Sequence, residues 1–386
     1  MSSSWPRKKL VEVCEKVKIE KAPVSIMPYI EIGDIDVETK MIKYKEKGAV
    51  KGSIFAPANC LIVSRVRPTR GAVALINKKI AVSSAFTILK PKPFLNLKFL
   101  FYCLAYNSKF FEYLGLRQKG SNYPSCREKD IFNFEIPLPP LEIQKRIVAR
   151  IEELFAKIDK AKELREKAKE ETEQIFPSVL QEVFIKNKKK WGVKNLGEIC
   201  EKIKQTHPKN IFKSEFSYID ITSIDPVSKS IISIKKIPVN EAPHRARKLV
   251  KEGDTIFATT RPYLKNIAYI SKDYDNCIVS TGFCVIRPKK EIADPLYIFF
   301  VVNSDSFVSQ ILPFQRGASY PAVSDSDVYN SEIPLPPLSE QKKIVDYLDN
   351  LREKIEKLKK LQEEQLKDLE ELKKSILEKA FAGELI

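Results

Sequence analysis

The sequence of 386 residues has only 2 histidines, 2 tryptophans and 12 glycines. So few histidines disfavour a His-based zinc site and a Ser-His-Asp triad. The 7 cysteines are odd in number, and no two of them form a CxxC pair. This usage fits the buried thiols of a cytosolic protein better than a disulfide framework or a cysteine-rich metal site.

Long apolar runs are also missing. The longest run, residues 296–302, is far shorter than the roughly 20 residues that span a bilayer. The first residues, MSSSWPRKKL, contain no apolar stretch of the kind found in a secretory leader. We therefore expect a soluble, cytoplasmic protein with no membrane partner, built from two or three domains at about 150 residues each.

Phosphate-binding glycine loops are absent as well, since neither GxxxxGK[ST] nor GxGxxG occurs. One segment, Asp294-Pro295-Leu296-Tyr297, comes close to the Asp-Pro-Pro-Tyr motif of amino-methyltransferases but lacks the second proline. Aspartate and proline are also favoured at the N-cap and first position of a helix, which is the interpretation we prefer for this segment. Because no carboxylates cluster to hold magnesium, we expect a chain without catalytic residues, bound metal or bound cofactor.

What the sequence does contain is one unit written twice. Residues 5–18, WPRKKLVEVCEKVK, match residues 191–204, WGVKNLGEICEKIK, at eight of fourteen positions. Further pairs follow in the same order and end with EIPLPPLEIQKRIV (135–148) and EIPLPPLSEQKKIV (332–345). Such self-similarity indicates a duplicated architecture. The offset between matching residues grows from 186 to 197, so we place the longer surface loops in the second half.

Each half combines short β-branched runs with an apolar helical segment, which is an α+β pattern. The runs CLIVSRV (60–66) and AVALI (72–76) predict strands, and residues 97–114 predict one mostly buried helix. The IPLPPL segments predict stiff, extended connectors, because consecutive prolines favour polyproline II. Long helices should begin just after them, with Ser339 as an N-cap and Glu142 at the positive helix end.

Both long helical segments have heptad repeats, with apolar residues alternating at spacings of four and three. Neither stripe could remain exposed over such a length, so we expect the two helices to pack as an antiparallel coiled coil. Arg165 and Gln362 are polar intrusions that would mark its register, and Pro177 predicts a break or kink in the first helix. The expected packing residues are Ile147, Ile151, Leu154, Ile158, Leu348, Leu351, Ile355 and Leu358.

The predicted architecture is therefore two pseudo-symmetric domains, 1–141 and 187–338, joined by helices within 142–186 and 339–386. Residues 1–141 contain 24 lysines and arginines against 12 acidic residues, a net charge of +12. Residues 177–338 contain 23 against 17, a net charge of +6, and the helices are nearly neutral. Two basic domains on a neutral frame are typical of nucleic-acid binding, although basic proteins that bind nothing are also common.

Two basic α+β units, each ending in EIPLPPLxxQKxIV and a long helix, resemble the specificity subunit of type I restriction-modification systems. The last helix closes with AFAGEL (380–385), and the resemblance covers nearly the whole chain. It implies two target-recognition domains that each read one half of a split double-stranded DNA sequence. It also implies that the two helices set the spacing between the halves and dock two methyltransferase subunits.

The same resemblance implies that the chain itself is non-catalytic. Restriction subunits join the complex, so methylation, of adenine in preference to cytosine, and ATP-dependent cleavage would belong to the partners. S-adenosylmethionine, ATP and Mg²⁺ would accordingly be bound by those partner subunits and not by this chain.

Residues that match between the halves should not distinguish two different half-sites, so we assign matched polar residues to phosphates or to the fold. Arg67 and Arg261 each precede a proline after a strand, and are candidate phosphate ligands or ordinary surface arginines. Two Gly-x-x-Tyr-Pro loops are more typical of packed turns, although the cation before each could reach DNA. These loops contain Lys119 with Tyr123, and Arg316 with Tyr320.

Unmatched cations are better candidates for base reading, because arginine can bond bidentately to guanine O6 and N7. We select Arg65, Arg70 and Lys51 in the first unit, and Arg245, Arg247 and Lys265 in the second.

Two other functions stay open at this point. One is a coiled-coil tether whose basic heads bind RNA or an acidic protein, which a gel shift comparing duplex DNA with RNA would distinguish. The other is a self-sufficient methyltransferase, which would need a cofactor site that the sequence does not offer.

Overall fold

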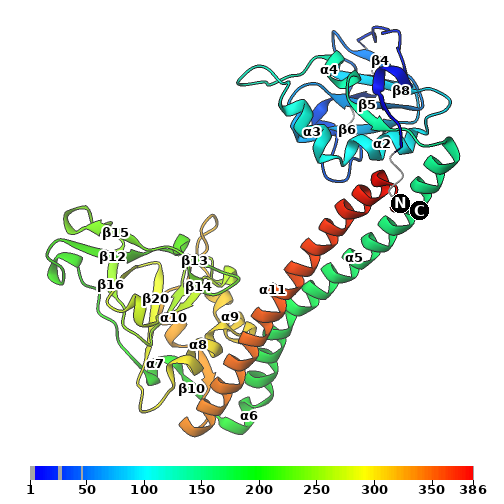
Figure 1. Ribbon diagram of the computed structural model, residues 1–386. Coiled ribbons are helices and arrows are strands. Elements are labelled where there is room, and N and C mark those ends of the chain that lie inside the picture. Colours follow the sequence, from blue (N-terminus) through cyan, green and yellow to red (C-terminus); the bar gives the residue numbers. More distant parts are fainter. Residues whose placement is uncertain (1–4, 25–27, 45–46, 386) are drawn as a thin grey trace. The chain divides into compact units, whose positions relative to one another are not determined.

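The computed structural model describes residues 5–24, 28–44 and 47–385. Residues 1–4, part of the segment considered for a secretory leader, lie outside it. The chain divides into two compact units, which we describe separately (Figure 1). The first unit contains residues 1–165 and 363–386, and the second contains residues 166–362. Each unit therefore has one α+β head together with part of both long helices.

The head of the first unit has two small sheets. A four-stranded antiparallel sheet has the order β2-β8-β5-β6, and a three-stranded sheet has the order β3-β7-β4 with β3 parallel to β7. Strands β5 and β6 coincide with the two runs that predicted strands. The bounds are β2 Cys14–Glu15, β8 Phe86–Pro91, β5 Cys60–Ser64, β6 Val73–Ile76, β3 Tyr29–Ile30, β7 Ile80–Val82 and β4 Ile54–Ala56.

The helices of this head cover its main sheet. The single helix expected over residues 97–114 is two helices, α2 (Leu97–Ala105) and α3 (Ser108–Gly115), so that prediction was wrong in its continuity. The break arises at Asn107, whose side chain caps α3 by accepting a hydrogen bond from the N–H of Phe110 at 3.3 Å. Two short helices complete the head, α1 (Leu10–Val13) and α4 (Glu128–Phe132).

The head of the second unit repeats this plan with longer loops. Its main sheet has the order β11-β20-β17-β18, and its second sheet has the order β15-β12-β19-β16. Strand β15 has no counterpart among the described residues of the first head, and it lies within one of the predicted insertions. The strands are β11 Cys200–Glu201, β20 Phe283–Pro288, β17 Thr255–Ala258, β18 Ile267–Tyr269, β15 Lys235–Pro238, β12 Glu215–Ile219, β19 Ile278–Ser280, β16 Ala246–Leu249, β13 Ile224–Asp225 and β14 Ser230–Ile231.

The helices of the second head are α6 Lys188–Trp191, α7 Leu196–Ile199, α8 Pro295–Asn303, α9 Asp305–Ile311 and α10 Asp325–Tyr329. The Asp294-Pro295 segment opens α8 as predicted. The Asp294 carboxylate accepts hydrogen bonds from the N–H groups of Leu296 and Tyr297, at 2.9 and 3.2 Å, and Pro295 is the first helical residue.

The proline-rich connectors begin as strands. Strand β9 (Glu135–Pro137) pairs with β1 (Arg7–Lys9), and β21 (Glu332–Pro334) pairs with β10 (Val193–Asn195), both antiparallel. The isoleucine in the middle of each connector strand is fully buried. The expected extended connector is thus also hydrogen-bonded to the start of its own unit.

A buried glutamine then ties each connector to its head. In the second unit the Gln341 amide nitrogen donates to Pro336 O and Ile292 O, at 2.8 and 3.1 Å. Its amide oxygen accepts from the Asp294 N–H at 2.8 Å, and the side chain is wholly buried. Gln144 makes the same three bonds in the first unit, to Pro139 O, Phe94 O and the Asn96 N–H. This contact explains why the repeated motif contains a glutamine.

The long helices are α5 (Leu141–Lys186) and α11 (Leu338–Ala382). Glu142 lies in the first turn of α5 as expected, but α11 begins at Leu338, so Ser339 is inside the helix and is not its N-cap. Pro177 was predicted to break or kink the first helix. Helix α5 continues through this residue without a break.

Within each unit the two helices run antiparallel. In the first unit, Asp159 pairs with Lys373 at 2.5 Å and Lys162 pairs with Glu370 at 2.7 Å. The residue number rises along α5 as it falls along α11, so the two helices are antiparallel. In the second unit, Leu180 and Phe184 share a core cluster with Ile344 and Leu348. Figure 1 shows the two ribbons, green and orange to red, side by side.

Most of the expected packing residues face this interior. Leu154 and Leu351 are half-buried, whereas Leu358 is 40% exposed, contrary to expectation. The buried members are Ile147, Ile151, Ile158, Leu348 and Ile355.

The exposure of Leu358 has a simple geometric reason. A stripe through Ile355, Gln362 and Ile376 continues equally well by a step of three or of four residues. The burial follows the step of four, so that the half-buried Lys359 replaces Leu358 and Leu372 becomes exposed. The heptad period was predicted correctly, but the residue that faces the interior between Ile355 and Gln362 was not: it is Lys359 and not Leu358.

The two proposed register residues differ in the structure. Arg165 is exposed, so it marks no register in the interior. Gln362 is buried and its amide nitrogen donates to Thr172 Oγ1 at 3.0 Å and to Ala168 O at 3.3 Å, while its amide oxygen has no partner.

We expect Gln362→Leu to raise the free energy of unfolding by about 1 kcal/mol, because it removes an unpartnered buried oxygen while Thr172 keeps its bond to Ala168 O. Urea unfolding of the full chain measures this change. Arg165→Leu, on the exposed face, is the matched control and should have almost no effect. A Gln362→Leu protein less stable than this control would contradict the prediction.

The seven cysteines are free and buried. Burial raises the pKa of the Cys14, Cys60 and Cys200 thiols to about 12, which keeps them protonated at neutral pH. Among the described residues, no single helix is long and apolar enough to cross a membrane. The pair 295–303 and 305–314 passes a test of length and composition only together, and it is bent by 69°.

Candidate nucleic-acid interface

A strained turn follows the central strand of each head. In the first unit, Arg67 has a left-handed backbone with φ of 47° and precedes the 3-10 turn η2 (Pro68–Arg70). Its N–H donates to Pro124 O at 2.6 Å, and its Nη2 donates to Asn122 O at 3.2 Å. The guanidinium lies 4.9 Å from the ring centre of Tyr123, which is 72% exposed.

The second unit builds the same arrangement. Arg261 has φ of 49° and precedes η6 (Pro262–Leu264), and its N–H donates to Pro321 O at 2.7 Å. Its Nη2 donates to Ser319 O at 3.3 Å, and the guanidinium lies 4.9 Å from the ring of Tyr320, which is 71% exposed. We call the arginine, its 3-10 turn and the stacked tyrosine the arginine turn of each unit.

The arginine turn suits contact with a nucleic-acid backbone. A non-glycine residue in the left-handed region costs about 1–2 kcal/mol, so the surrounding bonds must hold it there. The stacked guanidinium is fixed in direction and presents a cation beside an exposed aromatic ring. Arginine held in this way can donate to phosphate with charge-assisted bonds.

The Gly-x-x-Tyr-Pro loops are closed turns, but their tyrosines are exposed and not packed. Lys119 exchanges two backbone hydrogen bonds with Ser125, at 2.8 and 2.9 Å, and Arg316 does the same with Ala322, at 2.9 Å each. The side chains of both cations are exposed. Arg316 lies 3.5 Å from Asp327, whose pKa is lowered chiefly by hydrogen bonds from Ser324. Each loop therefore forms a closed turn and also exposes the side chain of its cation to solvent.

Two base-reading candidates of the first unit lie beside its arginine turn. Arg65 is half-buried and its Nη2 donates to Ser84 O, while Arg70 is exposed at the end of η2. Lys51 is exposed in the turn before β4, a strand of the other sheet, and none of its contacts among the described residues is with the arginine turn.

The candidates of the second unit are more divided. Arg245 is exposed, and Arg247 on β16 directs its Nη1 to Ala246 O at 2.7 Å and Pro243 O at 3.1 Å. Lys265 is at the arginine turn, but its ammonium forms an ion pair with Asp305 and its side chain is only 22% exposed. Lys265 is thus already partnered, which makes it a weaker candidate for reading a base.

Each arginine turn is contacted by a lysine that was not predicted from the sequence. Lys40 reaches the end of η2 and Lys229 reaches the end of η6, from loops of equivalent sequence. The signal was present, because DVETK (36–40) and DPVSK (225–229) are at the same repeat offset as the flanking YIEIGDID and YIDITSID.

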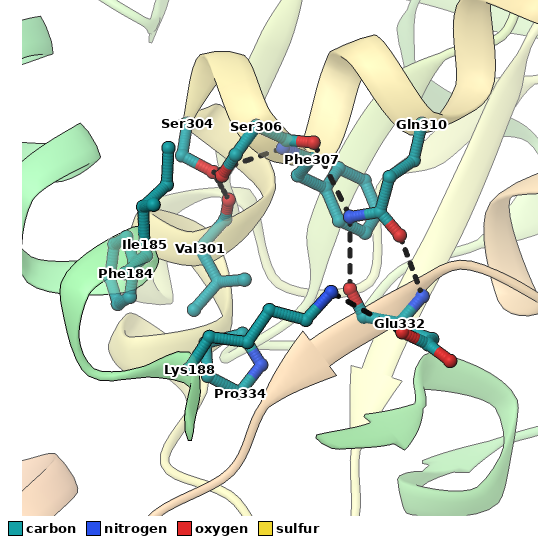
Figure 2. A pocket seen from close by; sticks show the side chains of 10 residues that line it. All are labelled: Phe184, Ile185, Lys188, Val301, Ser304, Ser306, Phe307, Gln310, Glu332 and Pro334. Atoms are coloured by element: carbon teal, nitrogen blue, oxygen red, sulfur yellow. Dashed lines mark hydrogen bonds and ion pairs between the residues drawn. The ribbon is translucent and has the colours of Figure 1, made fainter. Parts of the chain in front are cut away.

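The second unit also contains a pocket, and none of the residues of its arginine turn lines it. It has a volume of about 210 Å³ and lies between the end of α5, helices α8 and α9 and strand β21 (Figure 2). Its polar groups bind one another: Lys188 pairs with Glu332 at 3.3 Å, and Gln310 exchanges hydrogen bonds with the Glu332 backbone. Among the described residues, no group of three or more His, Cys, Asp or Glu side chains could hold a metal ion.

Comparison with known proteins gives a consistent family. The model of the type I restriction modification DNA specificity domain matches residues 2–170 and again residues 188–367. The MjaVIII specificity subunit of a type I restriction enzyme, from Methanocaldococcus jannaschii, is 27% identical over 73% of this chain and 70% of its own length. The HindI specificity subunit from Haemophilus influenzae is 25% identical over 43% of this chain, and the match spans only 36% of that relative.

Solved structures agree with the fold. The HsdS subunit from Thermoanaerobacter tengcongensis is 25% identical, with a TM-score of 0.65 over 99% of this chain and 97% of that chain. A chain solved in work on complex assembly and conformational transition of the type I R-M system has a TM-score of 0.77 at 24% identity, over 99% and 98% of the two chains. Both likenesses include the two heads and the long helices.

Proposed function

This chain belongs to the type I restriction modification DNA specificity family, and from that premise we propose that it reads a split DNA target, one half with each recognition domain. As a specificity subunit it is non-catalytic, and methylation and cleavage belong to the assembled complex. S-adenosylmethionine, ATP and Mg²⁺ would be bound by partner subunits in the cytoplasm. The alternative of a tether for RNA or an acidic protein has no support from the relatives.

The repeated arginine turn is the single observation that carries the proposed contact with DNA. The same strained arginine, stacked on the same exposed tyrosine, occurs once in each unit with equal geometry. A contact that is identical in two domains reading different sequences cannot select bases, so it fits the phosphate backbone. Neighbouring residues that differ between the units, such as Arg65 and Arg70, would then read base edges.

We expect the double variant Arg67→Met and Arg261→Met to bind duplex DNA about 100-fold more weakly. Charge-assisted bonds contribute about 1.5–3 kcal/mol each, and part of that is lost at each unit. The slope of log K against log salt concentration should also fall by about 1 to 2 units, since each phosphate contact contributes about 0.9. A gel shift or fluorescence anisotropy titration at several salt concentrations measures both quantities.

The control replaces two lysines outside the arginine turns, Lys90→Met and Lys236→Met, which removes the same charge. This control should weaken binding only a few-fold. Equal affinity in the arginine variant and the wild-type chain would refute the proposed phosphate contact, and equal loss in both variants would reduce it to general electrostatics.

The long helices offer the surface for partner subunits. Four of their exposed apolar residues match between the halves: Leu164 with Leu361, and Ile175 with Leu372. Each unit thereby exposes one equivalent pair, Leu164 and Leu372 in the first, Ile175 and Leu361 in the second. Two equal surfaces on a duplicated chain fit two copies of one partner, which for this family we propose to be methyltransferase subunits.

We expect Leu361→Glu to remove one of the two methyltransferase copies, and Leu164→Glu with Leu361→Glu to remove both, because a carboxylate cannot be buried unpaired in an apolar contact. The stoichiometry of the co-purified complex, from light scattering, is the measurement. Lys360→Glu, an exposed neighbour on the same helix, is the control and should leave two copies bound. Two copies bound to the double variant would disprove this docking surface.

A further inference from the structure

A lysine that no motif singled out holds the arginine turn of each unit. Lys40 lies at the end of η2, where its ammonium donates to Gly71 O at 2.9 Å and to Val37 O at 2.5 Å. Lys229 lies at the end of η6 and donates to Lys265 O at 2.7 Å. In both units the accepting carbonyl belongs to the residue that caps the 3-10 turn following the strained arginine.

The two lysines are themselves presented in the same way. Each is the fifth residue of a tight loop that begins with an aspartate, and the lysine N–H donates to the carbonyl of that aspartate at 2.8 or 2.9 Å. The carboxylate of Asp36 caps the N–H groups of Glu38 and Thr39, and that of Asp225 caps Val227 and Ser228. Both lysines have a left-handed backbone, with φ of 60° and 56°.

The surroundings of Lys40 leave its side chain little freedom, and Lys229 is half-buried. Lys40 is buried, with the rings of Tyr106 and Phe111 at 5.5 and 5.6 Å from its ammonium. A Cβ at Gly71 would come within 3.0 Å of that ammonium, so the packing is close. A buried ammonium is costly unless it is bonded, and what it bonds here is the backbone of the arginine turn.

We propose that Lys40 and Lys229 are positioning residues for DNA binding, which hold Arg67 and Arg261 in the orientation that contacts the phosphate backbone. This inference rests on the proposed function. The lysine ties the loop after the DxxxK aspartate to the far end of the arginine turn, and the tyrosine loop ties the near end through Pro124 O or Pro321 O. The left-handed arginine is thus fixed from both sides.

A double-mutant cycle tests the proposal, because a residue that acts through another loses its effect when the other is absent. The variants are Lys40→Met, Arg67→Met and both together, made in the full chain. The probe is a mixed-sequence DNA duplex at low salt, and folding is checked by circular dichroism. Lys90→Met removes the same charge from a half-buried position where the lysine pairs with Glu15, and it controls for long-range attraction.

We expect Lys40→Met to weaken DNA binding about 5- to 10-fold in the wild-type background and less than 2-fold in the Arg67→Met background. Equal loss in both backgrounds, or no loss in the first, would overturn the proposal. Lys229→Met with Arg261→Met forms an independent cycle in the other unit, so a first-unit variant that does not fold leaves the test intact. If Arg67→Met itself has no effect, the phosphate contact fails first, and the two failures are distinguished.

The pH dependence of binding gives a second measurement. Burial lowers the pKa of both lysines to about 8. The titratable groups facing Lys40 are Asp36 and Tyr106, and those facing Lys229 are Asp225, Lys265 and Asp305. Between pH 7 and 9 the wild-type chain should therefore lose more DNA affinity than the Lys40→Met, Lys229→Met protein. Parallel pH profiles for the two proteins would contradict the positioning role.

Discussion

Replacing Gln341 with leucine is expected to lower the free energy of unfolding of the second unit by about 3–5 kcal/mol. The substitution keeps the volume but breaks three bonds to the backbone: a buried one to Pro336 O and part-buried ones to Ile292 O and the Asp294 N–H. Each unpaired buried group costs about 1–3 kcal/mol. The lost hydrogen bonds lie where the connector enters α11, so the substitution should weaken the attachment of the head to this helix.

Urea unfolding followed by circular dichroism measures this change, and Gln144→Leu should affect the first unit equally because it breaks the same three bonds. Gln365→Leu is the control for the substitution itself, since this glutamine lies exposed on α11, in the part of the helix that belongs to the first unit. The two units can unfold in separate transitions, in which case each glutamine variant should shift a different one. A Gln341→Leu shift no larger than the control's would show that the motif glutamine has no structural role.

The glutamines show what sequence reasoning can and cannot reach. The repeated PLPPL-xx-Q block was plain in the sequence and predicted the family, the duplication and the start of both helices. Its mechanism was not visible, because Gln341 bonds Ile292 and Asp294, which are almost 50 residues away in the chain and belong to a different element. Local patterns report which elements form, whereas a buried polar bond depends on which elements meet.

The same limit explains the two errors along the helices. Heptad spacing predicted an antiparallel pair, yet the stripe between Ile355 and Gln362 can step by three or by four, and only the partner helix decides. Leu358 is therefore exposed, and Arg165 on α5 is exposed as well. At residues 97–114, continuous apolar character concealed a helix break that Asn107 makes by capping.

For the candidate interface, matching the halves selected Arg67 and Arg261 correctly as equivalent residues, and the structure places both in the same strained turn. The supporting lysines were not predicted, because each is more than 30 residues from the carbonyl that it bonds. Lys40 is 31 residues from its acceptor, Gly71, and the loop between them has a different length in each half. Their equivalence is visible only when the repeat is followed residue by residue.

Inserting one heptad into each long helix is expected to change the spacing of the DNA target while leaving both half-sequences unchanged. The insertion points are between residues 165 and 166 in α5 and between residues 362 and 363 in α11. These positions are the boundaries of the two compact units, so every contact within a unit is kept. Seven residues preserve the stripe that repeats at Ile355, Gln362 and Ile376.

Seven residues at 1.5 Å each lengthen each helix by about 10 Å, which corresponds to about three base pairs at 3.4 Å. We expect methylome mapping of a host that contains the extended chain and the proposed methyltransferase partner to show a gap longer by about three base pairs. An insertion into α5 alone is the control, because it breaks the pairing of the helices and should abolish modification. A doubly extended chain that still modifies only the original spacing would exclude the helices as the ruler, since neither recognition domain is altered by the insertion.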